Sequence, residues 1–178
     1  MAVLKPILVT GATGNIGGQV VRRLLAGGMP VRALVRNPRT AAFPPQVELA
    51  VGDLTVPESL DNCLNGIDTV FLVWVAPTEA VAPALERIAK YTRRIVLLSA
   101  PLKTPHPLFQ QPNPSRTRAE IIEQLIEKSG LQWTFLRPGM FASNALGWWG
   151  SQIRAGNTFV GHISKFRPRQ LTGATSRP

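Results

Sequence analysis

The sequence predicts an α/β fold: a doubly wound parallel sheet with helices on both faces. Two observations predict it. Short apolar segments alternate with amphipathic helical segments along residues 3–137, and this alternation is typical of a parallel sheet with right-handed crossovers. The first apolar segment is followed by glycines spaced G-x-x-G-x-x-G, at Gly11, Gly14 and Gly17. That spacing, between a strand and a helix, is typical of the Rossmann type of this fold.

Each expected element has its own signal. The strands are short runs rich in Val, Ile and Leu, as strands covered on both faces should be. They are expected at 3–10, 30–36, 47–51, 68–75, 94–99 and 131–137, with helices at 15–27, 57–64 and 79–91 and a last one from about Ser115.

The ends of these elements are also marked. Gly27-Gly28 ends the first helix, and Asn37-Pro38 turns the chain after the second strand. Residues 101–114 form a loop with five prolines. The last helix carries an apolar stripe and ends at Ser129-Gly130; the stripe consists of Ile121, Ile122, Leu125 and Ile126.

The periodicity fades beyond residue 150. We therefore predict one dinucleotide-binding domain over 1–150 and an incomplete segment with a basic tail over 151–178. Residues 151–160 are read as the end of a helix and a turn, and 161–178 as a disordered end.

Composition limits the function classes. The chain has 178 residues, of which 44% are hydrophobic, and one cysteine, Cys63. A lone cysteine rules out an internal disulfide and favours a reducing compartment, so a cytoplasmic location is expected. Its helical spacing from Leu60 indicates core packing. His106 and His162 are far apart in the sequence, so no metal site is predicted. No signal peptide is predicted, because the apolar start is short and interrupted by Lys5 and Pro6, and no apolar run is long enough to predict a membrane span.

The net charge of +10 favours nucleic-acid binding at first sight. The last acidic residue, however, is Glu127, and seven Lys and Arg follow it. Much of the excess charge therefore belongs to the C-terminal end and not to a face of the folded domain. Specific nucleic-acid binding is not predicted.

The three glycines have separate roles in a dinucleotide site. Gly11 allows the sharp turn off the strand, Gly14 lets backbone approach a pyrophosphate, and Gly17 lets the helix pack closely on the strand. The phosphates would lie at the helix N-terminus, where free N–H groups and the helix dipole favour an anion. A glycine-rich turn without a ligand is the alternative.

Arginine at the end of the second strand bears on the choice of cofactor. An acid there, about 20 residues past the turn, would bind the ribose 2′-hydroxyl of NAD. This chain has Arg36 in that place, with Arg32 and Arg39 nearby, and no acid before Glu48. A guanidinium pairs with a 2′-phosphate, so NADP(H) is predicted over NAD(H). A solvated basic surface is the alternative.

Three further positions lie at the ends of expected strands. Asp53 follows the third strand and either accepts from the adenine amino group or caps the helix near Pro57. Val73, near the end of the fourth strand, borders the cofactor, whereas the neighbouring Trp74 is read as core. Ser99 ends the fifth strand on the same edge.

Four segments together resemble the atypical short-chain dehydrogenase/reductase group, within it the NmrA-like and quinone-oxidoreductase-like NAD(P)-binding proteins. They are Thr10–Gly17, Val31–Pro38, Gly52–Leu54 and Ser129–Gly139. The resemblance covers about residues 3–150. It implies hydride transfer from NADPH to a small acceptor such as a quinone. The alternative that it implies is a non-catalytic, NADP(H)-sensing regulator with a protein partner.

The resemblance also implies site residues. The cofactor positions are Gly11, Thr13, Gly14, Asn15, Ile16, Gly17, Arg36, Asp53 and Leu54, with Ser99 at the nicotinamide end. Pro138, Gly139, Met140 and Phe141 would line the substrate pocket, with Asn144 nearby.

The chain departs from the wider group in two ways. Active members use a Tyr-x-x-x-Lys pair for proton transfer, but the one tyrosine, Tyr91, is followed four residues later by Ile95. No catalytic residue is therefore assigned. Family members also continue with further strands and helices, whereas residues 161–178 do not resemble them and look like the product of a truncated or frameshifted gene.

Overall fold

The computed structural model describes residues 4–101, 114–138 and 141–156. The chain falls into two units, one up to Gly139 and one from Met140. Each is described here by itself.

The first unit is built on a six-stranded sheet in which all neighbouring strands are parallel. The strands are β1 (Ile7–Val9), β2 (Val31–Val35), β3 (Val47–Val51), β4 (Thr69–Leu72), β5 (Arg94–Leu98) and β6 (Gln132–Leu136). Their order across the sheet is β3-β2-β1-β4-β5-β6, which confirms the predicted doubly wound fold. The order reverses between β1 and β4, and ligands bind at such a switch point.

The strands are connected by helices, two of which, α2 and α3, directly follow a tight 3₁₀ turn. The α-helices of this unit are α1 (Asn15–Ala26), α2 (Asp61–Leu64), α3 (Val81–Tyr91) and α4 (Pro114–Glu127), and the 3₁₀ helices are η1 (Pro38–Thr40), η2 (Pro57–Leu60) and η3 (Thr78–Ala80). The helix expected over 57–64 is therefore a 3₁₀ turn followed by one α-helical turn. Several strands are shorter than expected, because residues beyond the paired segments turn into loops.

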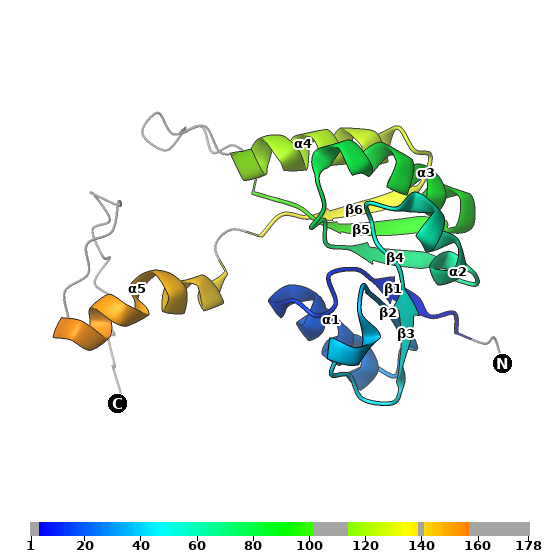
Figure 1. The fold of residues 1–178 in the computed structure, drawn as a ribbon. Coiled ribbons are helices and arrows are strands. Elements are labelled where there is room, and N and C mark those ends of the chain that lie inside the picture. The colour runs from blue at the N-terminus through cyan, green and yellow to red at the C-terminus, as the bar shows by residue number, and fades with distance from the viewer. Residues whose placement is uncertain (1–3, 102–113, 139–140, 157–178) are drawn as a thin grey trace, which may run out of the picture. The chain divides into compact units, whose positions relative to one another are not determined.

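The two faces of the sheet bury different helices (Figure 1). One face packs α2, α3 and α4 against apolar residues of β1, β4 and β5, including Leu8, Leu72 and Leu97. The other face packs α1 against Val9, Ala33 and their neighbours. Successive residues of the central strands alternate between the two cores, which is why these strands read as continuous apolar runs, whereas most residues of the edge strands β3 and β6 are exposed.

Cys63 belongs to the larger of these cores. It is 2% exposed, and its Sγ lies 3.3 Å from the carbonyl oxygen of Val51. Burial raises the pKa of this thiol, so the side chain is a packed, unreactive group, in agreement with the sequence-based interpretation.

The second unit contains one described helix, α5 (Ala142–Gly156). The N–H of Asn144 donates to the carbonyl of Phe141 at 2.9 Å and forms its first turn. Leu146 and Ile153 are 78% and 49% exposed. The helix runs through residue 150, and the predicted domain boundary there stays a prediction. No helix in the described part of the chain is long and apolar enough to cross a membrane.

Candidate functional site

The carboxyl ends of the parallel strands place the predicted site residues along one edge of the sheet. Thr10 follows β1, Arg36 follows β2, Asp53 lies just beyond β3, Val73 follows β4 and Ser99 follows β5.

Thr10 ties the ends of β1 and β4 together. Its side chain is 1% exposed overall, and its Oγ1 both accepts from the N–H of Val73 at 2.8 Å and donates to the carbonyl of Val73 at 2.9 Å. Both polar backbone groups of Val73 are thus paired by one hydroxyl. These two hydrogen bonds fix the point at which the glycine loop leaves the sheet.

The glycine loop has no room for side chains at two of its three glycines. Gly11 has a φ of +56°, and a Cβ there would lie 3.0 Å from the Cβ of Val73. A Cβ on Gly17 would lie 2.2 Å from the carbonyl oxygen of Gly11. The close approach of α1 to the loop therefore requires glycine at position 17, as the sequence analysis predicts.

The first turn of α1 is open to a ligand. Gly14 is its N-cap in extended backbone, without a side-chain cap, and the first turn carries no acidic residue. Thr13, Gly14 and Asn15 are exposed, and Ile16 is half-buried. Helix N-termini carry unpaired N–H groups and positive partial charge, and here no side chain competes for them. The cradle fits a pyrophosphate; the ligand role of these residues stays a prediction.

The three arginines of β2 and its following turn do not act together. Arg32 is committed to the protein: its Nη1 donates to the carbonyls of Cys63 and Asn65 at 2.8 and 2.7 Å. Its Nε also lies 2.9 Å from Glu48 Oε2, in an ion pair whose angle does not make a hydrogen bond. Arg36 and Arg39 are exposed. The predicted cluster therefore reduces to Arg36 and Arg39.

Asp53 is held by a turn and not by a helix. Its Oδ1 accepts from the N–H and the Oγ1 of Thr55, both at 2.8 Å. These hydrogen bonds, foremost that of the Thr55 N–H, and the charge of Arg36 outweigh burial and lower the pKa of Asp53. The suggestion that Asp53 caps the helix near Pro57 is wrong, because that helix has Val56 as its N-cap and no side-chain cap. Leu54 is 5% exposed and packs in the core.

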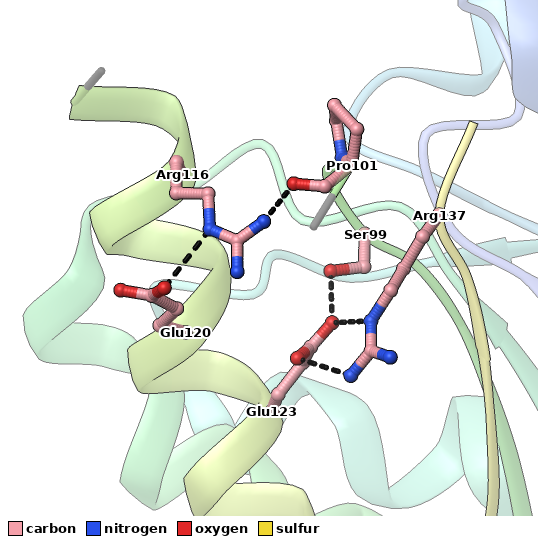
Figure 2. Close-up of polar contacts among 6 residues, drawn as sticks. All are labelled: Ser99, Pro101, Arg116, Glu120, Glu123 and Arg137. Carbon is pink, nitrogen blue, oxygen red and sulfur yellow. Dashed lines mark hydrogen bonds and ion pairs between the residues drawn. The ribbon is translucent and has the colours of Figure 1, made fainter. Parts of the chain in front are cut away.

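A buried carboxylate links three elements at the opposite end of this edge. Ser99 Oγ donates to Glu123 Oε1, and Arg137 donates to both carboxylate oxygens, from Nε at 2.9 Å and from Nη2 at 2.8 Å (Figure 2). Glu123 is 9% exposed. The Arg137 hydrogen bonds, more than the one from Ser99, lower the pKa of Glu123 against the opposing effect of burial.

A second pair of charged side chains lies on α4, the helix that carries Glu123, nearer the N-terminus of that helix. Arg116 Nε donates to Glu120 Oε1 at 2.9 Å, and its Nη1 donates to the carbonyl of Pro101 (Figure 2). A cavity of about 220 Å³ lies between the end of β5 and α4. Ser99, Trp74 and Arg118 are among the residues that line it.

The predicted substrate-pocket residues are divided between the two units. Pro138 follows β6 in the first unit, Phe141 and Asn144 belong to the second, and Gly139 and Met140 lie outside the described residues. The pocket stays a prediction.

Glu123 and Arg137, which hold Ser99 at this edge, were not predicted from the sequence. A signal for Glu123 was present: an acid beside Ile122 and three residues before Ile126 lies close to the buried stripe of its helix. A buried acid needs a partner. Nothing local in the sequence indicates that the partner is Arg137, which is 14 residues further on.

Comparisons with known proteins agree with this geometry. A family model described as NAD(P)H-binding matches residues 11–165. The (4-alkanoyl-5-oxo-2,5-dihydrofuran-3-yl)methyl phosphate reductase of Streptomyces griseus is 40% identical over 148 residues, covering 80% of this chain and 50% of the relative. The NAD(P)H azoreductase of Xenophilus azovorans is 36% identical over 146 residues, covering 79% and 50%.

The fold also has solved counterparts. The structure of the Citrobacter sp. triphenylmethane reductase complexed with NADP(H) superposes with a TM-score of 0.71 at 23% identity, covering 84% of this chain and 54% of that one. The chain thus spans about half the length of the curated relatives described above.

Proposed function

This chain belongs to the family of NAD(P)H-binding domains, and from that premise we propose that it binds NADPH in preference to NADH and passes a hydride to a small conjugated acceptor such as a quinone. The observation that carries the proposal is the uncapped glycine cradle with Arg36 exposed beside it. In a fold of this type the pyrophosphate lies on the first helix and the adenosine ribose at the end of the second strand.

Each predicted contact has a chemical reason. The N–H groups of α1 would hold the pyrophosphate, and the guanidinium of Arg36 would pair with the 2′-phosphate, which an acid at that position would repel. Thr55 occupies one oxygen of the Asp53 carboxylate, and the other would accept from the adenine amino group. Ser99, two strands from the glycine loop on the other side, would meet the nicotinamide.

The acceptor class follows from what the helix after β5 lacks. No tyrosine or lysine occurs in α4, and Tyr91 ends α3 on the amino side of β5. When bound, NADPH supplies the hydride. A conjugated acceptor spreads the resulting negative charge and takes its proton from water, so it needs no tyrosine. The names of the two relatives describe a reductase of an unsaturated oxo-dihydrofuran and a reductase of azo compounds, which fits acceptors of this kind.

A second function is favoured by the same absence. A domain that binds NADP(H) without a Tyr-x-x-x-Lys pair can act as a sensor that changes its protein partner with the cofactor state. In that case the cofactor is bound and not consumed. A protein partner and a cytoplasmic location belong to this part of the proposal and stay predictions.

Turnover separates the two functions. The protein is mixed with NADPH and, in turn, a quinone, an azo dye and an unsaturated lactone, and the loss of reduced nicotinamide is followed by absorbance. Hydride transfer predicts protein-dependent loss with at least one acceptor. Tight NADPH binding without loss for any acceptor would favour the sensor.

A further inference from the structure

Ser99 lies at the proposed nicotinamide end of the sheet edge. Its hydroxyl proton already takes part in a hydrogen bond to Glu123. A serine hydroxyl has one proton to donate and two lone pairs to accept with. The proton of Ser99 points to Glu123 Oε1, and the carboxylate is the acceptor in that bond because it is ionised. The hydroxyl therefore offers an approaching ligand lone pairs and no proton.

Glu123 is held so firmly that this polarity is built in. Arg137 donates to both of its oxygens, and the carboxylate is 9% exposed. The serine backbone is fixed separately, since the N–H of Ser99 donates to the carbonyl of Leu136 at 2.8 Å. The position of the hydroxyl is thus set by the backbone contact with β6, and its polarity is set by Glu123 of α4 (Figure 2).

We propose that Glu123 is a positioning residue that makes the Ser99 hydroxyl a hydrogen-bond acceptor for the carboxamide N–H₂ of the nicotinamide. The inference rests on the proposed function, which places the nicotinamide at the end of β5. Adjacent strands are about 4.8 Å apart, so the end of β5 is about 10 Å from the glycine loop. That separation is suited to the ring, whereas the intervening ribose would lie at the end of β4.

The proposal assigns Ser99 a different role from proton donation to the acceptor. A carbonyl oxygen of the acceptor would find only lone pairs at Ser99, and two lone pairs repel. A donor group on the cofactor is the matching partner. The acceptor would then bind without help from this hydroxyl.

Three ligands test the proposal by calorimetry: NADP⁺, its 3-acetylpyridine analogue, in which a methyl ketone replaces the carboxamide, and 2′-phospho-ADP-ribose, which has no nicotinamide. We expect the wild-type protein to bind NADP⁺ about three- to tenfold more tightly than the analogue, the value of one ordinary hydrogen bond. Ser99→Ala abolishes this preference and Ser99→Thr retains it. Glu123→Gln reduces it, because the amide can donate to Ser99 and free the serine proton.

The matched control is Glu120→Gln. Glu120 lies on the same helix and pairs with Arg116, so this variant loses a charge and an ion pair without touching Ser99, and we expect the wild-type preference. All variants should bind 2′-phospho-ADP-ribose as the wild type does, which shows that the rest of the site is intact.

Two results would overturn the inference while the proposed function stands: wild-type protein that binds NADP⁺ and the analogue equally, or a preference that survives Ser99→Ala. The preference of Ser99→Ala can be measured even if Glu123→Gln does not fold. Failure of 2′-phospho-ADP-ribose to bind the wild type would overturn the proposed function itself, and this inference with it.

Discussion

The glycine loop after β1 and the charged network at the ends of β5 and β6 are built from different chemical groups. The network consists of Ser99, Glu123 and Arg137. The loop is almost entirely backbone: glycines at 11, 14 and 17, an uncapped helix start, and one threonine that holds it to β4. The network is entirely side chains, brought together from β5, α4 and the end of β6.

The difference explains how each region performs its task. Backbone N–H groups at a helix start are fixed by the helix and recognise charge with little discrimination between anions. Side chains such as Ser99 can be oriented by their neighbours, so they can distinguish a donor from an acceptor. We therefore propose that the loop side of the edge supplies affinity for the dinucleotide and that the network side distinguishes a hydrogen-bond donor from an acceptor.

The largest expected effect comes from filling the loop. Gly17→Ala would place a Cβ 2.2 Å from the carbonyl oxygen of Gly11, so α1 must move away from β1. We expect a loss of about 3 kcal/mol of stability, at the upper end of overpacking costs, and loss of detectable NADPH binding. Thermal melting and calorimetry measure the two effects.

Gly27→Ala is the matched control at the other end of α1. A Cβ there lies 3.5 Å from its nearest neighbours, an ordinary contact, so stability should change by less than about 1 kcal/mol. If Gly17→Ala melted and bound like the wild type, the close approach of loop and helix would not be needed for binding.

The next largest effect tests the cofactor choice. Arg36→Ala should weaken NADPH binding about 10- to 100-fold, the value of charge-assisted hydrogen bonds, and leave NADH binding unchanged. Arg93→Ala removes the same charge at the amino edge, where the side chain is 84% exposed, and should change neither affinity. Equal weakening of NADPH and NADH by Arg36→Ala would contradict the assignment of Arg36 to the 2′-phosphate.

A smaller effect tests the two hydrogen bonds between the Thr10 hydroxyl and the backbone of Val73. Thr10→Val keeps the shape of the side chain but leaves the N–H and carbonyl of Val73 without the hydroxyl that pairs them. We expect a loss of about 1–3 kcal/mol, measured by urea unfolding. Thr40→Val removes an exposed hydroxyl that donates to the Asn37 carbonyl and should cost less than about 0.5 kcal/mol. Equal losses of stability in the two variants would argue against a stabilising role for the Thr10 hydrogen bonds.

The smallest effect concerns acid. The pKa of Glu123 is lowered from its usual 4.5, chiefly by its hydrogen bonds from Arg137. Its contribution to stability is therefore present above about pH 4.5 and lost as the pH falls through the lowered value. The melting temperature of the wild type should fall more steeply below pH 4.5 than the melting temperature of Glu123→Gln, by a few degrees. Parallel curves would mean that Glu123 titrates normally.

The loop could be predicted from the sequence and the network could not, for a physical reason. Gly11, Gly14 and Gly17 are close in sequence and each responds to local backbone geometry, so their pattern is legible. The fold followed from equally local alternation. Ser99, Glu123 and Arg137 are up to 38 residues apart. The parallel pairing of β5 with β6 brings Ser99 near Arg137, and α4 places Glu123 against both.

Local patterns also misled in two places. The clustering of Arg32 with Arg36 in sequence suggested a shared ligand, but Arg32 lies within β2, where its guanidinium reaches carbonyls of the α2 region. A helix cap near Pro57 was one of two interpretations of Asp53, and it is excluded because Asp53 closes a turn with Thr55; its contact with the adenine stays a prediction. Both errors come from side-chain direction, which spacing alone does not set.

We propose that this edge of the sheet binds NADPH through the glycine loop and Arg36. A paired titration of the wild-type protein with NADPH and NADH, followed by tryptophan fluorescence, tests this binding mode. We expect saturable NADPH binding and NADH binding at least about tenfold weaker. Equal affinities would contradict the role of Arg36, and a folded protein that binds neither would contradict the site as a whole.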